Sequence, residues 1–74
     1  MTIAVLGAGM VGRAIALDLA RDYEVTSFDL SAMNLEELKS RNPSIQTAAA
    51  DLSIFDEYEN WFSPFDLVVT AVPG

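Results

Sequence analysis

Three glycines near the N-terminus constrain this chain more than any other feature. They stand in Gly7-Ala8-Gly9-Met10-Val11-Gly12, directly after the apolar segment Thr2-Ile3-Ala4-Val5-Leu6. At this spacing the first glycine allows a sharp turn out of a strand, the second lets a pyrophosphate approach the backbone, and the third lets a new helix lie close to the sheet. The N–H groups at the start of that helix would bind the phosphates. The alternative is a tight strand–helix turn without a ligand.

An acidic residue follows where a dinucleotide site requires one. Asp29 ends a second predicted strand, 22 positions after Gly7, close to the roughly 20 of the dinucleotide-binding pattern. A carboxylate there can accept hydrogen bonds from both hydroxyls of the adenosine ribose but repels a 2′-phosphate, for which an arginine is the usual partner. No arginine occurs in the segment 30–33. The sequence therefore favours NAD over NADP, and the alternative for Asp29 is a residue that caps a turn.

Hydrophobic patterning predicts alternating strands and helices along the whole chain. Strands are expected at about 2–6, 24–28, 44–49 and 65–71, with helices between them, the last starting near Ser53. Right-handed crossovers between parallel strands place the fourth strand on the far side of the first. The predicted fold class is α/β, an incomplete Rossmann-type parallel sheet with the connectivity βαβαβαβ and the strand order 3-2-1-4.

Two details of the helices follow from the same pattern. In the helix after the glycines, Val11, Ile15 and Leu19 recur at i, i+4 and i+8 and are expected to face the core, with Ala14 and Ala16 beside them. In the next helix, Asn34 is expected to be the N-cap, because Glu37 stands three positions later as in a capping box. That helix is expected to end at residue 40 or 41, since a proline follows at position 43.

Size and composition limit the possible functions. We expect residues 1–74 to be the N-terminal part of a dinucleotide-binding domain, because the last predicted strand is followed by no helix to cover the sheet; the alternative is a free-standing half-domain. The net charge of −7 argues against nucleic acid and anionic membranes as partners. The sequence contains no cysteine and no histidine, which argues against a metal site and fits a reducing, cytoplasmic location.

Further residues are expected at the same edge of the sheet. Asp51 and Leu52 follow the third predicted strand, where an adenine ring would lie, although turn chemistry explains Asp51 equally well. Val72 and Pro73 follow the fourth strand and would pass near the nicotinamide ribose, unless they form a plain turn. Leu30, Met10 and Val11 are expected beside the cofactor. Arg13 is either a phosphate contact or, more commonly, a surface charge.

The usual catalytic groups of a dehydrogenase are missing. There is no histidine to act as a general base, and the pair Tyr-x-x-x-Lys is absent because Phe62 stands four residues after Tyr58. We therefore expect this segment to bind a cofactor without catalysing a reaction alone.

Three segments carry a resemblance to a known family. They are Ile3 to Ala16 with the glycines, Val25-Thr26 to Asp29-Leu30-Ser31 with Asn34-Leu35, and Phe65 to Val69 with Ala71-Val72-Pro73-Gly74. Together they resemble the N-terminus of the saccharopine dehydrogenase-like superfamily, and lysine 6-dehydrogenases within it. The resemblance implies an NAD or NADP cofactor held by Gly7, Gly9, Gly12 and Asp29, and less firmly by Asp51 and Pro73. It implies hydride transfer from an amine-bearing carbon of an amino acid to nicotinamide, with the catalytic residues further along.

The leading hypothesis is therefore the NAD-binding segment of an oxidoreductase acting on the CH–NH or CH–NH2 group of an amino acid. We expect the full-length protein to be a homo-oligomer. One alternative is an NAD(H)-sensing regulatory domain without catalysis, and a methyltransferase that uses S-adenosylmethionine fits less well.

Overall fold

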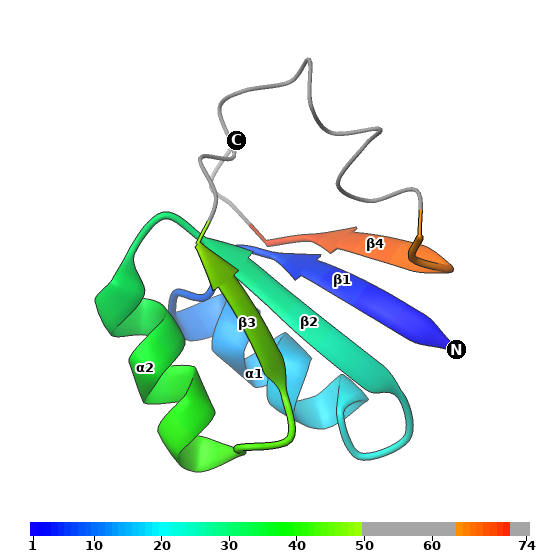
Figure 1. Cartoon of the computed structure of the whole chain (residues 1–74), viewed down its shortest axis with the longest axis horizontal. Helices are drawn as coiled ribbons and strands as arrows, with labels where there is room; N and C mark the ends of the chain where they lie inside the picture. Colours follow the sequence, from blue (N-terminus) through cyan, green and yellow to red (C-terminus); the bar gives the residue numbers. More distant parts are fainter. Residues whose placement is uncertain (50–63, 72–74) are drawn as a thin grey trace.

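The chain folds around a four-stranded parallel sheet. The computed structural model describes residues 1–49 and 64–71. In these ranges the strands run in the order β3-β2-β1-β4, all parallel (Figure 1). The elements are β1 (Thr2–Leu6), α1 (Met10–Leu19), β2 (Glu24–Asp29), α2 (Ala32–Arg41), β3 (Gln46–Ala49) and β4 (Leu67–Thr70). The predicted α/β class, the parallel sheet and the order 3-2-1-4 are confirmed.

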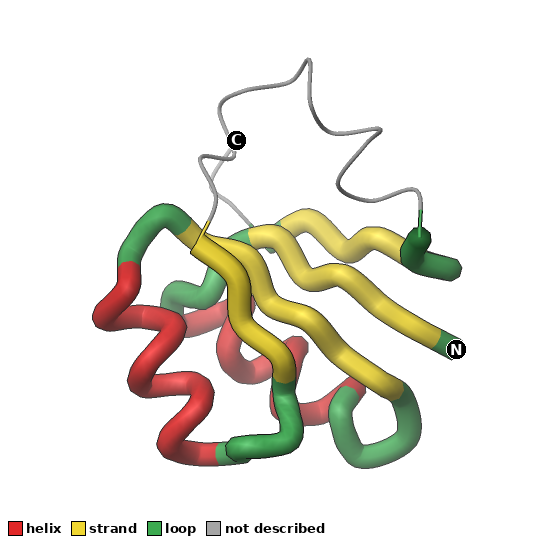
Figure 2. Tube along the Cα trace, viewed as in Figure 1, coloured by secondary structure: helices red, strands yellow, loops and turns green. Residues whose placement is uncertain are grey.

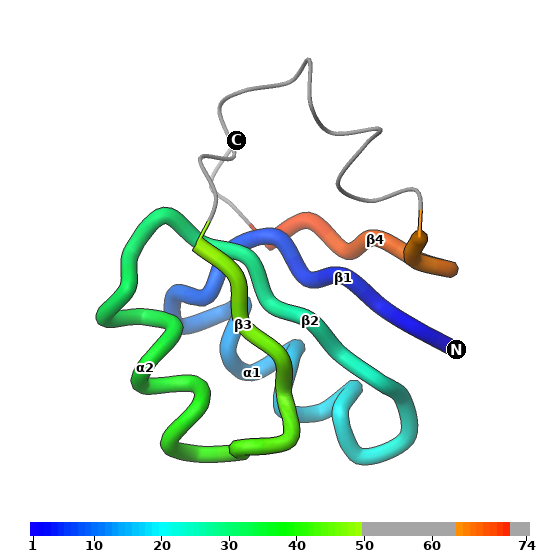
Figure 3. Tube along the Cα trace, in the orientation of Figure 1, coloured from blue at the N-terminus to red at the C-terminus, as the bar shows by residue number. Residues whose placement is uncertain are grey.

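The strand register brings all four carboxyl ends to one edge of the sheet. Leu6 at the end of β1 lies opposite Phe28 of β2 and Thr70 of β4, and Asp29 lies opposite Ala49 of β3. Figure 3 shows β4 beside β1, although the two strands are far apart in the sequence. The loops that leave β1 and β2 therefore start next to each other.

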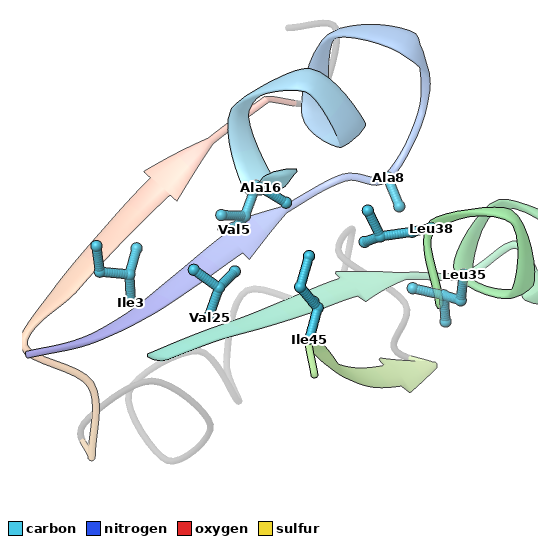
Figure 4. Packing of buried hydrophobic residues seen from close by; sticks show 8 residues of the cluster. All are labelled: Ile3, Val5, Ala8, Ala16, Val25, Leu35, Leu38 and Ile45. Atoms are coloured by element: carbon cyan, nitrogen blue, oxygen red, sulfur yellow. The ribbon is translucent and has the colours of Figure 1, made fainter. Parts of the chain in front are cut away.

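Both described helices cover the same face of the sheet. Figure 2 shows α1 and α2 on one side of the sheet, and Figure 4 shows the side chains of Ile3 and Val5 of β1 and of Val25 of β2 in the buried cluster. The buried cluster comprises Ile3, Val5, Ala8, Ala16, Val25, Leu35, Leu38 and Ile45. The opposite face has a smaller cluster of Ala4, Leu6 and Phe28, in which the rings of Phe28 and Phe65 meet edge to face with centroids 5.8 Å apart. Burial on both faces explains why β1 is apolar at consecutive positions.

The predicted core stripe of α1 is confirmed at Ile15 and Leu19, which pack against the buried cluster, and is wrong at Val11. Gly12 and Ala16 are its buried residues, whereas Ile15 and Leu19 are partly buried and Val11 is 66% exposed. The helix meets the sheet through its smallest residues, so the larger side chains pack beside the contact line. Close packing at Gly12 turns Val11 away from the core.

The predicted N-cap of α2 is also wrong. The cap is Ser31, whose Oγ accepts a hydrogen bond from the N–H of Asn34 at 3.3 Å, so the helix begins at Ala32. A serine that bonds the N–H three residues later is a standard N-cap, and it leaves the side chain of Asn34 available for another partner. The helix ends at Arg41, as predicted.

The last two strands are shorter than expected. β3 starts at Gln46 because Ser44 is held in a turn by Asn42, whose Oδ1 accepts from the N–H and Oγ of Ser44. β4 starts at Leu67, after Asp66 has bonded with its carboxylate to the N–H and hydroxyl of Thr2. The helix expected from Ser53 lies outside the described residues.

Candidate functional site

The three glycines of the loop 7–12, here called the glycine loop, have three different structural situations. Gly7 has a φ of 103°, in the left-handed region that favours glycine, and its N–H donates to the carbonyl of Phe28 at 2.7 Å. A Cβ on Gly12 would collide with the carbonyl oxygen of Gly7 and would lie 2.7 Å from its carbon. Backbone conformation therefore explains Gly7, and helix packing explains Gly12.

Gly9 has neither explanation. Its φ of −70° suits any residue, and a Cβ placed on it would meet none of the described atoms within 4 Å. The space in front of Gly9 is open and belongs to the surface of the loop. A glycine here keeps the backbone accessible to something that approaches from outside.

The start of α1 is suited to an anion. The N-cap is Gly9, which has no side chain, and within the described part of the chain no side-chain cap bonds the first N–H groups of the helix. The first turn also contains no acidic residue. The unpaired N–H groups and the helix dipole therefore concentrate positive charge at this point without a side chain that offsets it.

Asp29 joins the glycine loop to the start of α2. Its Oδ2 accepts from the N–H of Ala8 at 2.7 Å, and its Oδ1 accepts from the N–H of Ser31 at 2.8 Å. The amide nitrogen of Asn34 lies 3.5 Å from Oδ2. Partial burial by itself raises the pKa of Asp29, but the hydrogen bonds from Ser31, Ala8 and Asn34 outweigh burial and hold the pKa below its ordinary value. Asp29 is therefore a fixed negative charge at neutral pH.

These residues surround one cavity at the carboxyl edge of the sheet. Its volume is about 380 Å³, and it is lined by Gly7, Gly9, Met10, Val11, Gly12, Asp29, Asn34 and Ala71. A larger cavity of about 440 Å³ lies at the other end of the strands, with Thr2, Glu24 and Gln46 in its lining. The larger cavity includes no residue of the glycine loop. The smaller one combines a helix start, a carboxylate and an amide, so we regard it as the candidate site.

Arg13 faces the second helix. Its guanidinium lies 3.9 Å from the carboxylate of Glu37, which also pairs with Arg41 at 3.1 Å. The side chain of Arg13 is only 24% exposed. The guanidinium therefore links α1 to α2.

The structure brings together many of the predicted site residues. Gly7, Gly9, Met10, Val11, Gly12 and Asp29 line the cavity, and Ala8 binds Asp29 through its N–H. Leu30 is 68% exposed and is outside the cavity lining. Asp51, Leu52, Val72 and Pro73 lie outside the described residues.

Sequence reasoning missed Asn34 and Ala71 as lining residues. For Asn34, the available signal was Ser31, three positions earlier, because serine is as good an N-cap as asparagine. With Ser31 as the cap, the side-chain amide of Asn34 would have been recognised as available for another role.

The described residues contain neither a membrane-spanning helix nor a metal-binding cluster. No helix in the ranges 1–49 and 64–71 is long and apolar enough to cross a membrane. The same ranges contain no group of three or more His, Cys, Asp or Glu side chains placed to hold a metal ion.

The chain resembles known proteins in sequence and in structure. A family model described as the saccharopine dehydrogenase NADP binding domain matches residues 3–74, whereas no curated protein sequence matches the chain. The structure is similar to apo saccharopine dehydrogenase (L-Glu forming) from Saccharomyces cerevisiae, with a TM-score of 0.79 and 23% identity over 97% of this chain and 16% of that one. It is also similar to the PbgP3 protein from Burkholderia pseudomallei, with a TM-score of 0.73 and 21% identity over 96% of this chain and 25% of that one. At these identities the two structures show a shared fold, and the chain spans a minor part of each.

Proposed function

The chain belongs to the saccharopine dehydrogenase NADP-binding domain family, and on this premise we propose that it binds NAD for an amino-acid dehydrogenase. Family membership makes it a domain that binds a nicotinamide dinucleotide. The proposal adds three things: the choice of NAD, the residues that hold it, and the reaction of the full-length protein. That reaction is oxidation at the CH–NH or CH–NH2 group of an amino acid.

The observation that carries the proposal is the open face of Gly9. Among the described residues, neither backbone conformation nor packing requires a glycine there, so close approach of a ligand is the physical reason that we assign to it. The ligand expected at a helix start without an acidic residue is an anion, and a pyrophosphate fits that position.

The choice of NAD rests on the charge at the other end of the cavity. Asp29 is held negative by two short hydrogen bonds from backbone N–H groups. No lysine or arginine is among the described residues that line the cavity, and Arg13 is paired with Glu37. A 2′-phosphate would face Asp29 without a cation, whereas a free ribose hydroxyl can donate to it. The family name mentions NADP, so this choice is the part most in need of a test.

The proposed roles of the chain are binding and orientation. The cofactor supplies the hydride acceptor, and the protein supplies its position and electrostatic environment. The start of α1 would hold the pyrophosphate, Gly9 would allow it to come close, and Asp29 would orient the adenosine ribose. Leu30, Asp51, Leu52, Val72 and Pro73 stay predicted cofactor contacts. A homo-oligomeric state and a cytoplasmic location stay predictions as well.

The test is a calorimetric titration of the full-length protein and its Gly9→Ala variant with NAD and NADP. An alanine fits the backbone at position 9 and meets no described atom, so the variant should keep the unfolding temperature of the wild type. Its methyl group should displace the pyrophosphate and weaken NAD binding by roughly tenfold or more, equal to about 1.4 kcal/mol. Glu36→Ala, on the exposed face of α2, is the control and should bind as the wild type does.

Four results would count against the proposal. Absence of dinucleotide binding by the folded wild type would refute it, and tighter binding of NADP would refute the choice of NAD. Unchanged NAD affinity in Gly9→Ala would refute the assigned role of Gly9. If NAD binds but no amino acid yields NADH, the NAD(H)-sensing alternative replaces the dehydrogenase.

A further inference from the structure

The side chain of Asn34 has no role in the function proposed above. Asn34 lies in the first turn of α2, lines the candidate cavity, and is partly buried. Its backbone N–H serves the cap by donating to Ser31, while its amide nitrogen lies 3.5 Å from Oδ2 of Asp29. The amide is therefore placed beside the carboxylate that would receive the ribose.

One acceptor position of Asp29 is weakly held. A carboxylate has about four acceptor positions, two on each oxygen. The N–H of Ala8 occupies one on Oδ2 and the N–H of Ser31 occupies one on Oδ1, at 2.7 and 2.8 Å, and the N–H of Leu30 adds a further hydrogen bond. The amide of Asn34 approaches the second position on Oδ2 only at the limit of hydrogen-bond distance. A ribose hydroxyl would compete most easily for this position.

A hydroxyl that donates to Oδ2 would also lie within reach of the amide. The hydroxyl oxygen has acceptor lone pairs left after it donates, and the nitrogen of Asn34 carries N–H donors. The amide and the carboxylate together offer one donor and one acceptor at a single point in the cavity. This arrangement is complementary to a free hydroxyl. A deoxyribose offers neither group a partner at this point. A 2′-phosphate could accept from the amide but has no proton to donate to Asp29.

We propose that Asn34 is a specificity-determining residue, whose amide donates to a ribose hydroxyl that itself donates to Asp29. The inference rests on the proposed binding of NAD. Asn34 would recognise the hydroxyl as an acceptor while Asp29 recognises it as a donor. The competing explanation is a structural tether, in which the amide only holds the start of α2 against Asp29.

Substitution of Asn34 should leave the fold intact. Asp29 keeps its two shorter bonds to Ala8 and Ser31, and the cap of α2 uses the backbone of residue 34. Asn34→Leu has a similar size and has no donor. Asn34→Asp keeps the shape and replaces the donor with an acceptor. Gln46→Glu makes the same amide-to-carboxylate change at the opposite end of the strands, where residue 46 pairs with Thr26, and is its matched control.

The experiment compares the affinities of the full-length variants for three ligands: NAD and its analogues lacking the 2′- or the 3′-hydroxyl of the adenosine ribose. Asn34→Leu should bind NAD about five- to tenfold more weakly, the loss expected for one hydrogen bond. For one of the two deoxy analogues the loss should be much smaller, and that analogue identifies the hydroxyl. Asn34→Asp should lose more NAD affinity than Asn34→Leu, while Gln46→Glu should match the wild type.

The outcomes separate the two proposals. An equal loss for all three ligands in Asn34→Leu would overturn the inference in favour of the tether, although NAD binding by the wild type would still stand. Unchanged NAD affinity in Asn34→Leu would overturn it as well. A wild type that binds no NAD would refute the proposed function itself.

Discussion

The junctions β1–α1 and β2–α2 lie side by side at the same edge of the sheet, yet they are built in opposite ways. The first consists of glycines, and its helix starts without a side-chain cap. The second consists of polar side chains, and Ser31 caps its helix. Among the described residues, one helix start has no side-chain cap and is where we propose that an anion binds, and the other is capped by the protein. The capped start of α2 shows that the same sheet edge can hold a helix start closed by its own side chain, so the uncapped start of α1 is specific to the glycine loop.

Asp29 connects the two junctions. It belongs to the β2–α2 junction by sequence, but one of its oxygens binds the N–H of Ala8 in the glycine loop. The open junction is therefore held in shape by a side chain of the closed one, which also carries the charge proposed to recognise the ribose.

The largest effect is expected from closing the packing contact of the first junction. A methyl group in Gly12→Ala would collide with the backbone of Gly7, so α1 must move away from the sheet. Overpacking of this kind costs about 1–3 kcal/mol, and a collision with backbone atoms places Gly12→Ala near the upper end of that range, against a gain in helix propensity of roughly 1 kcal/mol. We expect a net loss of about 2 kcal/mol in the free energy of unfolding, measured by urea denaturation. Gly9→Ala is the comparison and should be neutral; equal stability of the two variants would contradict the difference assigned to these glycines.

A smaller effect is expected from removing the cap of the second junction. Ser31→Ala deletes the oxygen that accepts from the N–H of Asn34, and loss of such a cap costs about 1 kcal/mol. The N–H of residue 31 still bonds to Asp29, so NAD affinity should change little. Ser31→Thr retains a capping hydroxyl and should restore most of the stability. A large loss of NAD binding in Ser31→Ala would show that the two junctions are not separable in this way.

The smallest effect is expected from the protonation of Asp29. Its pKa in the folded chain is below the ordinary value of 3.8, so its contribution to stability is complete above about pH 4 and is lost as the pH falls through the folded pKa. The unfolding free energy of Asp29→Asn should therefore fall less steeply below about pH 4 than that of the wild type. Asp66, whose pKa is lowered by hydrogen bonds from the N–H and hydroxyl of Thr2, titrates in the same range, so Asp66→Asn is measured in parallel. Identical slopes for Asp29→Asn and the wild type would contradict the assignment.

The features that the sequence predicted correctly depend on local rules. The order of the strands follows from the handedness of crossovers, and β1 was recognisable because burial on both faces requires consecutive apolar residues. The glycines and Asp29 line one cavity, as their spacing indicated; that this cavity binds the cofactor stays a prediction.

The incorrect predictions fall where two local rules apply to the same segment, or where tertiary packing determines which residues are buried. Ser31 and Asn34 are both good caps, and the choice depended on which one faces Asp29 in space. The exposure of Val11 depended on how closely Gly12 approaches Gly7, which the i, i+4, i+8 periodicity does not contain. The starts of β3 and β4 depended on turns at Ser44 and Asp66. The adenine and nicotinamide contacts at Asp51, Leu52, Val72 and Pro73 stay predictions.

The bond between Asp29 and Ala8 restricts how this domain can evolve toward another cofactor. For a domain that binds NAD as proposed, replacing Asp29 with a neutral or cationic residue is the obvious single step toward NADP, but that step also removes the acceptor that holds the glycine loop. The first substitution would therefore impair the old cofactor and the new one together. A lineage that changes preference needs a second substitution to hold Ala8 before or alongside the change at position 29.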